Sequence, residues 1–577
     1  MRHLEYRLSD LRKLAKQGPQ HGQTVRIALL GDSATQFLTE ALLGHAAARG
    51  LRADVFEAGI GQIDSQIFNR DSALYLHEPD FVIVFRSNTK LYEDFSASDL
   101  APEGFAEAQL RGVKAQIDAI LSFRPGCKII YFNFPELNDY LFGNYGNSTA
   151  RSFIYQLRKI NLSLMELAQT CDALLICDLC SLQNRYGRDA VHDPKWQISA
   201  GLAYGLDFLP AVAKHVFDIV TAVRGAARKC VILDLDNTLW GGVLDEGGME
   251  NIQLGELGAG KAFCDLQRWL KRLKQRGIIL AVCSKNDEAI AKEPFQSHPD
   301  MVLRLEDIAV FVANWENKVD NIRHIQEILN IGFDSMVFLD DNPFEREMVA
   351  QAIPDITVPA LPSDPVLYLD FLQKLNLFEV ASVSGADDDR TLQYQQEAAR
   401  RQVRALYQSE QAYLSSINMR ANFRPFAPLD LPRVAQLSQR SNQFNLRTSR
   451  YTTADIERIA QSDGHFTLSF ELSDDYGRYG LVVALILERN ADDTLFIEAW
   501  MMSCRVLNRG LEHFVLNQLV DLAKRHGYRT IKGEYLPTRK NALVKDLYER
   551  LGFVGRDRYW YLSVQDYEMK PTAIAAE

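Results

Sequence analysis

The sequence predicts a chain of several α/β domains. Short apolar runs alternate with helix-like stretches, a pattern typical of parallel sheets with crossover helices. Several of these runs end directly at Asp, Ser or Gly, as strands do where ligands bind at the carboxyl edge of a sheet. The chain has 577 residues, more than one hydrophobic core usually serves. We therefore expect about three or four domains.

The composition favours a folded enzyme. Hydrophobic residues make up 47% of the chain and charged residues 24%, and the net charge is −11, so neither disorder nor a basic footprint for nucleic acid is indicated. No apolar run approaches the roughly 20 residues that span a bilayer, and the N-terminus has no signal-peptide core. The eight cysteines are scattered, and Cys177 with Cys180 lacks the second pair of a zinc site. We expect a cytoplasmic protein that binds neither nucleic acid nor membrane.

The N-terminal part predicts a helical arm over residues 1–22 and an α/β domain over residues 23–225. The first expected strand, TVRIALLG, runs into Asp-Ser, so Ser33 lies on a turn that leads into a helix. Near the end of the domain, Asp189 precedes His192 by three residues. Serine, histidine and aspartate are the groups that nucleophilic acyl transfer uses.

The most informative segment is VILDLDNTLWGG, near the start of a second domain expected over residues 226–380. Asp234 and Asp236 end an apolar run with one residue between them, so their side chains point the same way. At this spacing Asp234 could attack a phosphorus atom while Asp236 shuttles the proton.

Three further elements follow in order. Ser284 ends the run IILAVCS, Lys318 lies in WENKVDNI, and Asp340 with Asp341 ends SMVFLDD. A hydroxyl, a fixed cation and a carboxylate pair are what a phosphoryl group and its metal require. Mg²⁺ prefers such oxygen ligands, and the expected ligands are Asp234, Asp236, Asp340 and Asp341.

Three sequence motifs, LDLDNTLWGG, CSKND and LDDNP, resemble those of the FkbH-like branch of the haloacid dehalogenase (HAD) superfamily, subfamily IIIC. The interval from Asp236 to Ser284 holds only a glycine-rich turn and one helical stretch, which indicates a capless Rossmann-like domain. The resemblance implies that Asp234 is the nucleophile, Asp236 the acid/base, Ser284 the phosphate-binding hydroxyl, Lys318 the charge-neutralising lysine, and Asp340 with Asp341 the metal-side acids.

In the N-terminal domain, G-D-S followed by D-x-x-H resembles the SGNH hydrolases, which implies a flavodoxin-like fold. By that resemblance Ser33 is a nucleophile, His192 its base and Asp189 the residue that orients the histidine. The oxyanion would be held by Gly59 or Gly61 together with Asn88. The alternative is a retained fold that docks a partner or shields the phosphatase crevice.

The C-terminal part predicts a helical linker over residues 381–424 and an α/β domain over residues 425–577. The linker is polar and helix-prone, and its cluster Arg400, Arg401 and Arg404 could meet an acidic partner. The last domain resembles the GNAT acyltransferases, in which helix-terminal amides hold the phosphopantetheine of coenzyme A or of a carrier protein. The residues implied to bind it are Arg505, Asn508, Arg509, Gly510 and Asn541, and Cys504 beside them is a candidate acyl carrier.

The FkbH resemblance implies an enzyme that dephosphorylates 1,3-bisphosphoglycerate and loads a glyceryl unit onto the phosphopantetheine thiol of an acyl carrier protein, in polyketide-type biosynthesis. Its expected cofactors are Mg²⁺ and the carrier's phosphopantetheine. An alternative is a HAD phosphatase or acyltransferase that acts on a sugar or surface-glycan intermediate without a carrier. A second alternative is a non-enzymatic scaffold that binds a carrier protein.

Overall fold

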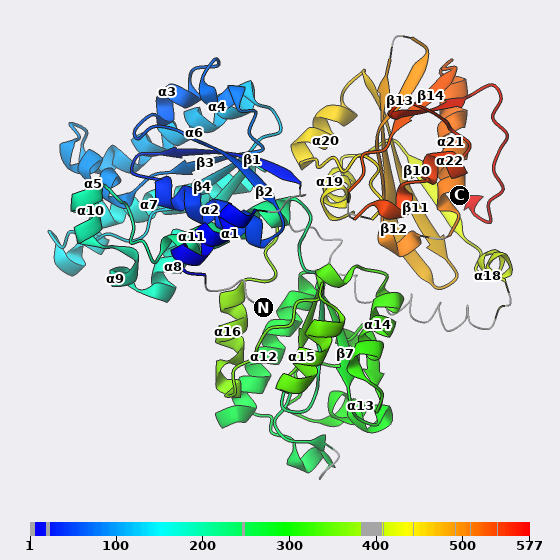
Figure 1. The fold of residues 1–577 in the computed structure, drawn as a ribbon, viewed down its shortest axis with the longest axis horizontal. Coiled ribbons are helices and arrows are strands. Elements are labelled where there is room, and N and C mark those ends of the chain that lie inside the picture. Colours follow the sequence, from blue (N-terminus) through cyan, green and yellow to red (C-terminus); the bar gives the residue numbers. More distant parts are fainter. Residues whose placement is uncertain are drawn as a thin grey trace. The chain divides into compact units, whose positions relative to one another are not determined.

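The computed structural model describes residues 6–18, 23–244, 248–381, 407, 409–441, 443–490, 492–507, 509–538 and 540–577. Its internal contacts form two compact units, Arg2–Thr221 and Ala222–Glu577. The first unit contains one sheet and the second contains two (Figure 1). The expected multidomain α/β architecture with parallel sheets is confirmed.

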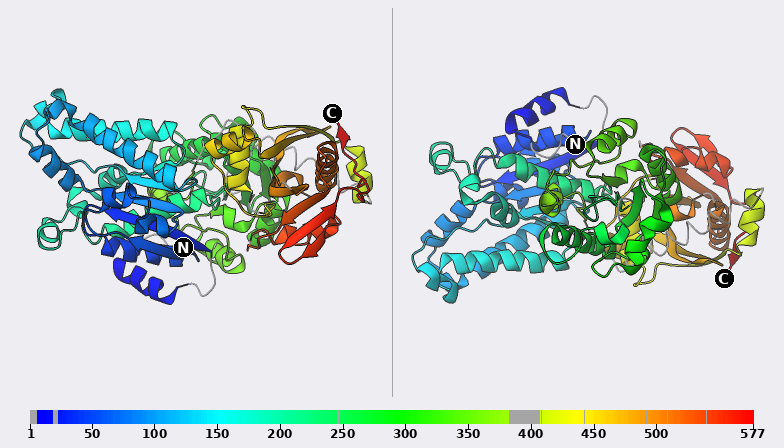
Figure 2. Two further views of the ribbon diagram at one scale, coloured as in Figure 1. Left: turned by 90° about the horizontal axis from the view of Figure 1, so that it is seen from above. Right: turned by 90° about the horizontal axis from the view of Figure 1, so that it is seen from below.

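The sheet of the N-terminal unit has five parallel strands in the order β2-β1-β3-β4-β5. All five residues of β3 are buried, as expected for a central strand that is covered on both faces. Long helices lie on the two faces of this sheet in both views of Figure 2. The strands are β1 Thr24–Gly31, β2 Arg52–Glu57, β3 Phe81–Phe85, β4 Lys128–Phe132 and β5 Leu174–Cys177.

The predicted N-terminal arm forms helix α1, which packs against helix α2. Leu11 of α1 is fully buried, and its backbone fills the space beside Gly44, where a Cβ atom would come within 2.5 Å of it. The arm is therefore part of the unit. The main helices of this unit are α1 Leu8–Gln17, α2 Gln36–Ala48, α5 Asn88–Ala97, α6 Phe105–Phe123, α7 Phe153–Thr170, α8 Leu179–Tyr186, α9 Arg188–Val191, α10 Pro194–Ala200 and α11 Leu209–Val223.

The first sheet of the second unit has four parallel strands in the order β8-β7-β6-β9. Every residue of β6, β7 and β9 is buried, so these strands are apolar throughout rather than alternating. The strands are β6 Cys230–Leu233, β7 Ile279–Ser284, β8 Val310–Ala313 and β9 Met336–Leu339, and the helices are α12 Gly258–Gln275, α13 Glu288–Ser297, α14 Lys318–Leu329, α15 Pro343–Ala352 and α16 Tyr368–Leu375.

The second sheet of this unit is mixed, with eight strands in the order β15-β16-β14-β13-β12-β11-β10-β17. Its strand β10 begins at Arg420, inside the predicted linker. Most of that linker, including Arg400, Arg401 and Arg404, lies outside the described residues. The strands are β10 Arg420–Arg424, β11 His465–Asp474, β12 Gly477–Arg489, β13 Thr494–Met502, β14 Thr530–Glu534, β15 Val554–Arg556, β16 Tyr559–Ser563 and β17 Ala575–Ala576, and the helices are α18 Glu410–Ser416, α19 Leu431–Arg440, α20 Thr453–Ala460, α21 Leu511–Arg525 and α22 Leu547–Arg550.

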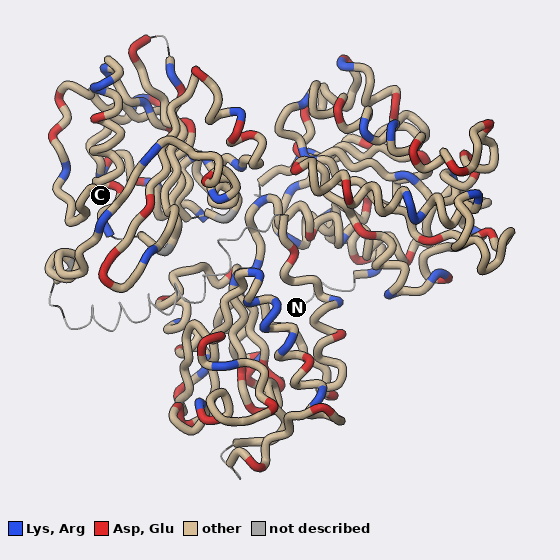
Figure 3. The backbone as a smooth tube through the Cα atoms, turned by 180° about the vertical axis from the view of Figure 1, so that it is seen from behind, with Lys and Arg blue, Asp and Glu red and all other residues tan. Residues whose placement is uncertain are grey.

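Charged residues of both signs are interspersed along the described parts of the chain in Figure 3. Within the described ranges, no helix combines the length and the apolar character that crossing a membrane requires.

Candidate active site

Asp234 lies directly after β6, at the carboxyl edge of the parallel sheet. Its amide extends the strand pairing by donating to the carbonyl of Leu339 in β9, with an N–O distance of 2.9 Å. The chain then turns at Asn237, whose φ of 54° is in the left-handed region that asparagine tolerates. This turn leaves Asp234 and Asp236 at the edge where α/β sheets bind ligands.

Lys318 and Ser284 both contact Asp234. Lys318 Nζ lies 2.8 Å from Asp234 Oδ1, and Ser284 Oγ donates a hydrogen bond to the same oxygen, also at 2.8 Å. Lys318 is the first residue of α14, and Asn317 caps that helix by accepting a hydrogen bond from the amide of Val319. The structure therefore brings together three groups that the sequence separates widely.

Asp340 and Asp341 complete a cluster of carboxylates beside Asp234. Asp340 is fully buried; its Oδ2 lies 2.6 Å from Lys318 Nζ, and its Oδ1 accepts a hydrogen bond from the amide of Asn342 at 2.8 Å. One carboxylate oxygen from each of Asp234, Asp340 and Asp341 lies within 4.8 Å of the others. Three carboxylates at this spacing form an oxygen-only donor set that fits a hard divalent cation.

The carboxylate of Asp236 has different neighbours. Trp240 Nε1 and the amide of Leu244 donate to its Oδ1 at 2.9 and 3.2 Å, and Asn286 Nδ2 donates to its Oδ2 at 3.0 Å. Among the described residues, the carboxylates close enough to share an ion are those of Asp234, Asp340 and Asp341. The structure therefore does not support the expected ligation by the Asp236 side chain, because hydrogen-bond donors already surround it.

Burial shifts the protonation of this cluster. Burial and the nearby charge of Asp340 raise the pKa of Asp234 to about 6, against the opposing effect of Lys318. Burial also raises the pKa values of Asp340 and Asp341. Burial disfavours the charge of Lys318, but attraction to Asp234 and Asp340 outweighs it and raises the pKa of this lysine above its usual value. One lysine does not balance three carboxylates, two of them buried and one partly buried, and a divalent cation would remove this imbalance.

Sequence reasoning missed Trp240 and Asn286. Trp240 is fully buried and Asn286 is 1% exposed, so both are fixed parts of the site. The missed signal was local, because Asn286 follows Ser284 by two residues and Trp240 follows Asp236 by four. A third contact also comes from the D-x-D-x-T motif, since Thr238 Oγ1 accepts a hydrogen bond from the amide of Asp341 at 3.1 Å.

The site has little covering structure of its own. Between Asp236 and β7, which ends at Ser284, the described residues form the short helix Gly248–Asn251 and α12, with no additional sheet. Trp315, on the loop after β8, is 68% exposed, and Phe344, in the first turn of α15, is 70% exposed. Because carboxyl ends of parallel strands meet at one edge, these aromatic side chains belong to the rim of the site.

The residues expected to form a serine triad in the N-terminal unit are not joined by hydrogen bonds. Ser33 Oγ is buried and has no hydrogen-bond partner, so it is not bonded to His192. His192 follows α9 and is partly buried, while Asp189 within α9 is exposed. The amide of Ala34 donates to the carbonyl of Gly201, which places that segment over the turn that carries Ser33. A working triad would need this region to rearrange.

Two other polar side-chain atoms of the same unit are buried in the same way as Ser33 Oγ. Asn88 Oδ1 and Tyr204 Oη are buried without a hydrogen-bond partner, although Asn88 Nδ2 donates to the carbonyl of Pro135 at 3.0 Å. Asn88 follows β3, so it lies at the same carboxyl edge as Ser33.

The predicted pantetheine-binding residues are engaged within the chain. Arg509 is 6% exposed, and its Nη1 lies 3.8 Å from the buried carboxylate of Asp474. Asn541 is fully buried; its Nδ2 donates to the carbonyls of Asn445 and Leu536. Both side chains therefore have partners within the chain, and their binding of a cofactor stays a prediction. Asn508 and the side chain of Arg505 lie outside the described residues.

Gly510 and Cys504 lie on the loop before α21, and their roles stay predictions. Gly510 has a φ of 70° and precedes the first residue of α21, as a tight loop into a helix requires. Cys504 starts a short 3₁₀ helix and is partly buried, and its carbonyl accepts a hydrogen bond from Asn330 Nδ2 at 3.0 Å.

The split between β13 and β14 is filled by the chain itself. Their parallel pairing ends at Phe496 and Lys532. Beyond that point, the amide of Met502 donates to the carbonyl of Phe444 at 3.1 Å, and the amide of Leu536 donates to the carbonyl of Leu446 at 2.9 Å. Phe444, Asn445 and Leu446 are each at most 2% exposed. An extended pantetheine arm therefore does not fit between these strands.

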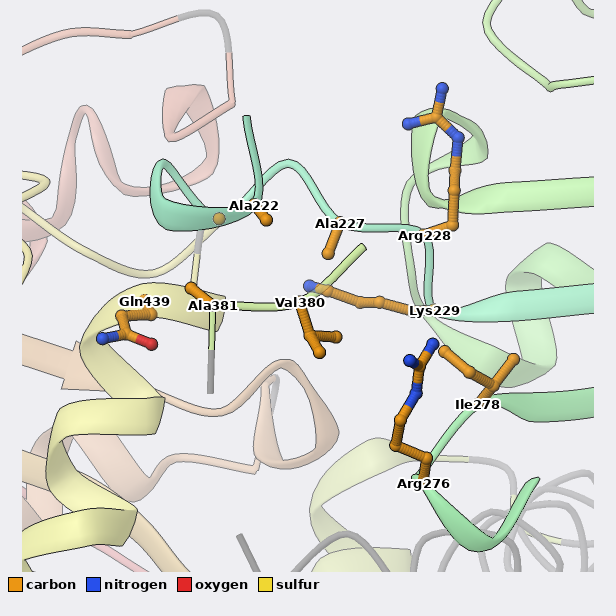
Figure 4. Close-up of a pocket in the computed structure, with 10 residues that line it drawn as sticks. Ala222, Ala227, Arg228, Lys229, Arg276, Ile278, Val380, Ala381 and Gln439 are labelled. Atoms are coloured by element: carbon orange, nitrogen blue, oxygen red, sulfur yellow. The ribbon is translucent and has the colours of Figure 1, made fainter. Parts of the chain in front are cut away.

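A cavity in the second unit lies away from the carboxylate cluster (Figure 4). Arg228 and Lys229 precede β6 and Arg276 precedes β7, so they lie at the amino ends of the strands. Arg228 Nε donates to Thr357 Oγ1 and Arg276 Nη2 donates to the carbonyl of Phe378. The cavity is thus at the edge opposite the candidate active site.

Comparisons with known proteins identify the family. Residues 26–221 match the family FkbH, N-terminal domain. A solved structure of the N-terminal part of the protein BF1531 from Bacteroides fragilis, containing a phosphatase domain and complexed with Mg, is 46% identical over 65% of this chain and 100% of that one, with a TM-score of 0.63. The chain belongs to the FkbH family. The family assignment and this neighbour support a HAD-like phosphatase.

Two further solved structures each match about a quarter of this FkbH-family chain. The ribosomal-protein-S18-alanine N-acetyltransferase from Escherichia coli is 18% identical over 25% of this chain and 94% of its own, with a TM-score of 0.20. The spermidine N-acetyltransferase from Vibrio cholerae, in complex with CoA and spermine, is 13% identical over 26% and 98%, with a TM-score of 0.22. No curated protein matches the chain.

Proposed function

We propose that the chain is a Mg²⁺-dependent phosphatase in which Asp234 is the nucleophile and Asp236 the general acid/base. The observation that carries this proposal is the contact of Lys318 and Ser284 with one oxygen of Asp234, next to the buried carboxylate of Asp340. A nucleophile bonded to a cation and a hydroxyl donor is suited to an attack on a phosphoryl group that carries negative charge.

The reaction has two steps. In the first, Asp234 forms a bond to phosphorus, the bond from phosphorus to the leaving oxygen breaks, and Asp236 gives its proton to that oxygen. In the second, Asp236 takes a proton from water, the water oxygen bonds to phosphorus, and the acyl-phosphate bond to Asp234 breaks. Asp234, Asp340 and Asp341 would hold Mg²⁺, which would neutralise charge and orient the phosphate. The Mg in the Bacteroides fragilis relative supports this assignment.

We further propose, from the FkbH resemblance, that the substrate is 1,3-bisphosphoglycerate and that a glyceryl unit passes to the phosphopantetheine thiol of an acyl carrier protein. The chemistry then assigns different roles to the two phosphates. Attack of Asp234 on the acyl phosphate would release a free carboxylate, which cannot form a thioester without new activation. Asp234 must therefore remove the ester phosphate at C3. The acyl phosphate at C1 is displaced by a thiolate, which bonds to the carbonyl carbon as inorganic phosphate leaves.

The open rim of the active site suits this proposal. A capless site admits a macromolecular partner, and the exposed Trp315 and Phe344 offer apolar contact beside it. The carrier's arm would reach this site directly, because the split in the C-terminal sheet is filled by Phe444–Leu446. Within the proposal, the GNAT-like domain supports carrier docking, and Cys504 is the candidate for transient acyl capture.

Intact-protein mass spectrometry tests the proposed function. The enzyme is mixed with Mg²⁺, 1,3-bisphosphoglycerate generated in situ, and a phosphopantetheinylated carrier protein from its own gene neighbourhood. A glyceryl mass on the carrier that depends on Asp234 is the expected result. Phosphate release without any mass gain on the carrier would favour the alternative, a phosphatase that acts on a sugar or surface-glycan intermediate.

A further inference from the structure

Asn286 joins the two catalytic aspartates through one hydrogen-bonded chain. Its Nδ2 lies 3.0 Å from Asp236 Oδ2 and 3.2 Å from Ser284 Oγ, and Ser284 Oγ in turn donates to Asp234 Oδ1 at 2.8 Å. Asn286 is 1% exposed and Ser284 is 2% exposed, so water does not compete for these bonds. The chain runs from the nucleophile to the acid/base without a gap.

Chemistry fixes the orientation of the Asn286 amide. Ser284 Oγ already donates its one proton to Asp234 Oδ1, so it accepts from Asn286, and the NH₂ group must face Ser284 and Asp236. The opposite flip would place Asn286 Oδ1 against Ser284 Oγ, with two acceptors in contact. In the orientation observed, Asn286 Oδ1 is buried and has no hydrogen-bond partner.

Asn286 lies on a different segment of the chain from the other two hydrogen-bond donors to Asp236. Trp240 Nε1 and the amide of Leu244 belong to the same loop as Asp236, and both bond its Oδ1. Asn286 follows β7 and bonds Oδ2. Its contact therefore ties the loop to the sheet that positions the nucleophile, which fixes the Asp236 carboxylate relative to Asp234.

We propose that Asn286 is a positioning residue that holds Asp236 for proton transfer to the leaving group. This proposal rests on the proposed phosphatase function and adds a residue to it. Loss of Asn286 frees Asp236 Oδ2 and removes the link to Ser284. The consequence depends on the substrate, because an alkoxide needs a proton in order to leave whereas a phenolate or carboxylate leaves without one.

The test compares two classes of leaving group in the variants Asn286→Ala and Asn286→Asp. kcat/KM reports only the steps through release of the leaving group. With glycerol phosphate, we expect it to fall by about 10²-fold or more, the usual contribution of general acid catalysis. With p-nitrophenyl phosphate, kcat/KM should change by less than about 10-fold. The kcat for p-nitrophenyl phosphate should fall, because Asp236 must still activate water, and phosphoenzyme should accumulate.

Lys285→Met is the matched control. Lys285 precedes Asn286 in the chain but pairs with Glu345 at 2.6 Å rather than with Asp236. Its ratio of kcat/KM values for the two substrates should stay at the wild-type value. Equal losses with both substrates in both Asn286 variants, or no loss with either, would overturn the positioning role. Failure of the phosphatase proposal itself is distinguishable, since Asp234→Asn would then still hydrolyse both substrates.

Discussion

Lys318 Nζ and Asp234 Oδ1 form an ion pair of 2.8 Å in which the side chains are 4% and 9% exposed. The same nitrogen lies 2.6 Å from Asp340 Oδ2. One cation therefore neutralises part of the charge on two buried carboxylates that lie at the ends of different strands. Without the lysine, the two carboxylates would repel each other. Removal of Lys318 should therefore lower both the stability of the fold and the activity.

Lys318→Met should destabilise the phosphatase part and abolish phosphate release. Breaking a buried ion pair leaves an uncompensated charge, which costs about 3–5 kcal/mol. Chemical denaturation measures the loss. Lys261→Met is the control, because its pair with Asp265 is largely exposed and should contribute little. A Lys318→Met variant with wild-type stability and turnover would remove the central role of this lysine.

Mg²⁺ should raise the unfolding temperature of the wild-type chain, and chelation should reverse the increase. An ion that binds only the folded state stabilises it by mass action. The Asp340→Asn variant removes one of the three clustered carboxylates and should reduce the Mg²⁺-dependent increase. Thermal unfolding with and without Mg²⁺ gives both values. An equal increase in wild type and variant would place the bound ion elsewhere.

Acid should destabilise the N-terminal unit through His45. Burial and the charge of Arg49 lower the pKa of His45 from 6.5 to about 3. Between these values the unfolded chain binds a proton that the folded chain does not, so stability falls as pH decreases from about 6.5 towards 3. Burial raises the pKa of Asp32 to about 6, which acts in the opposite direction between pH 3.8 and 6.

The variant His45→Gln isolates the histidine from the aspartate. Hydrogen exchange of β1 peptides measures local stability at pH 7 and at pH 5. The loss of protection on acidification should be smaller in the variant than in the wild type, because its glutamine binds no proton. An identical loss in both proteins would assign the acid sensitivity to other groups.

Cys504→Ala should block acyl capture while phosphate release from the C3 ester continues. Cys504 lies on a separate short helix and has no contact with the carboxylate cluster among the described interactions. Mass spectrometry of the enzyme, with and without carrier protein, distinguishes the two activities. If the variant loads the carrier as well as the wild type does, Cys504 has only a packing role. The glyceryl group would then pass directly to the carrier thiol.

Several residues of the candidate site could be predicted from the sequence because they lie at the ends of strands, and the structure brings them together. Asp234, Ser284 and Asp340 each follow an apolar run, so one rule about parallel sheets placed all three at one edge. Lys318 was predicted from the segment WENKVDNI and the family resemblance, and in the structure it opens the helix after β8 and contacts Asp234. Trp240 and Asn286 were missed since their role depends on side-chain direction after a turn, which the spacing of apolar residues does not encode.

The C-terminal sheet was harder to predict for a different reason. The loop before Gly510 resembled a phosphate-binding loop, yet the contacts of Arg509 and Asn541 come from Asp474 and Asn445, which are distant in the sequence. The insertion of Phe444–Leu446 between β13 and β14 likewise depends on long-range pairing. Neither relationship leaves a local pattern. The Ser33 turn shows the same limit, since the covering segment near Gly201 is far from it in the chain.

Trapping the phosphoenzyme tests the central claim most directly. The wild type and Asp234→Asn are each mixed with Mg²⁺ and a phosphate ester, quenched in acid, digested and sequenced by mass spectrometry. The account predicts a phosphoryl group on Asp234 in the wild type, no phosphopeptide in the variant, and no phosphate release from a variant with an unchanged circular dichroism spectrum. Phosphate release by folded Asp234→Asn, or a phosphoryl group on another residue, would contradict it.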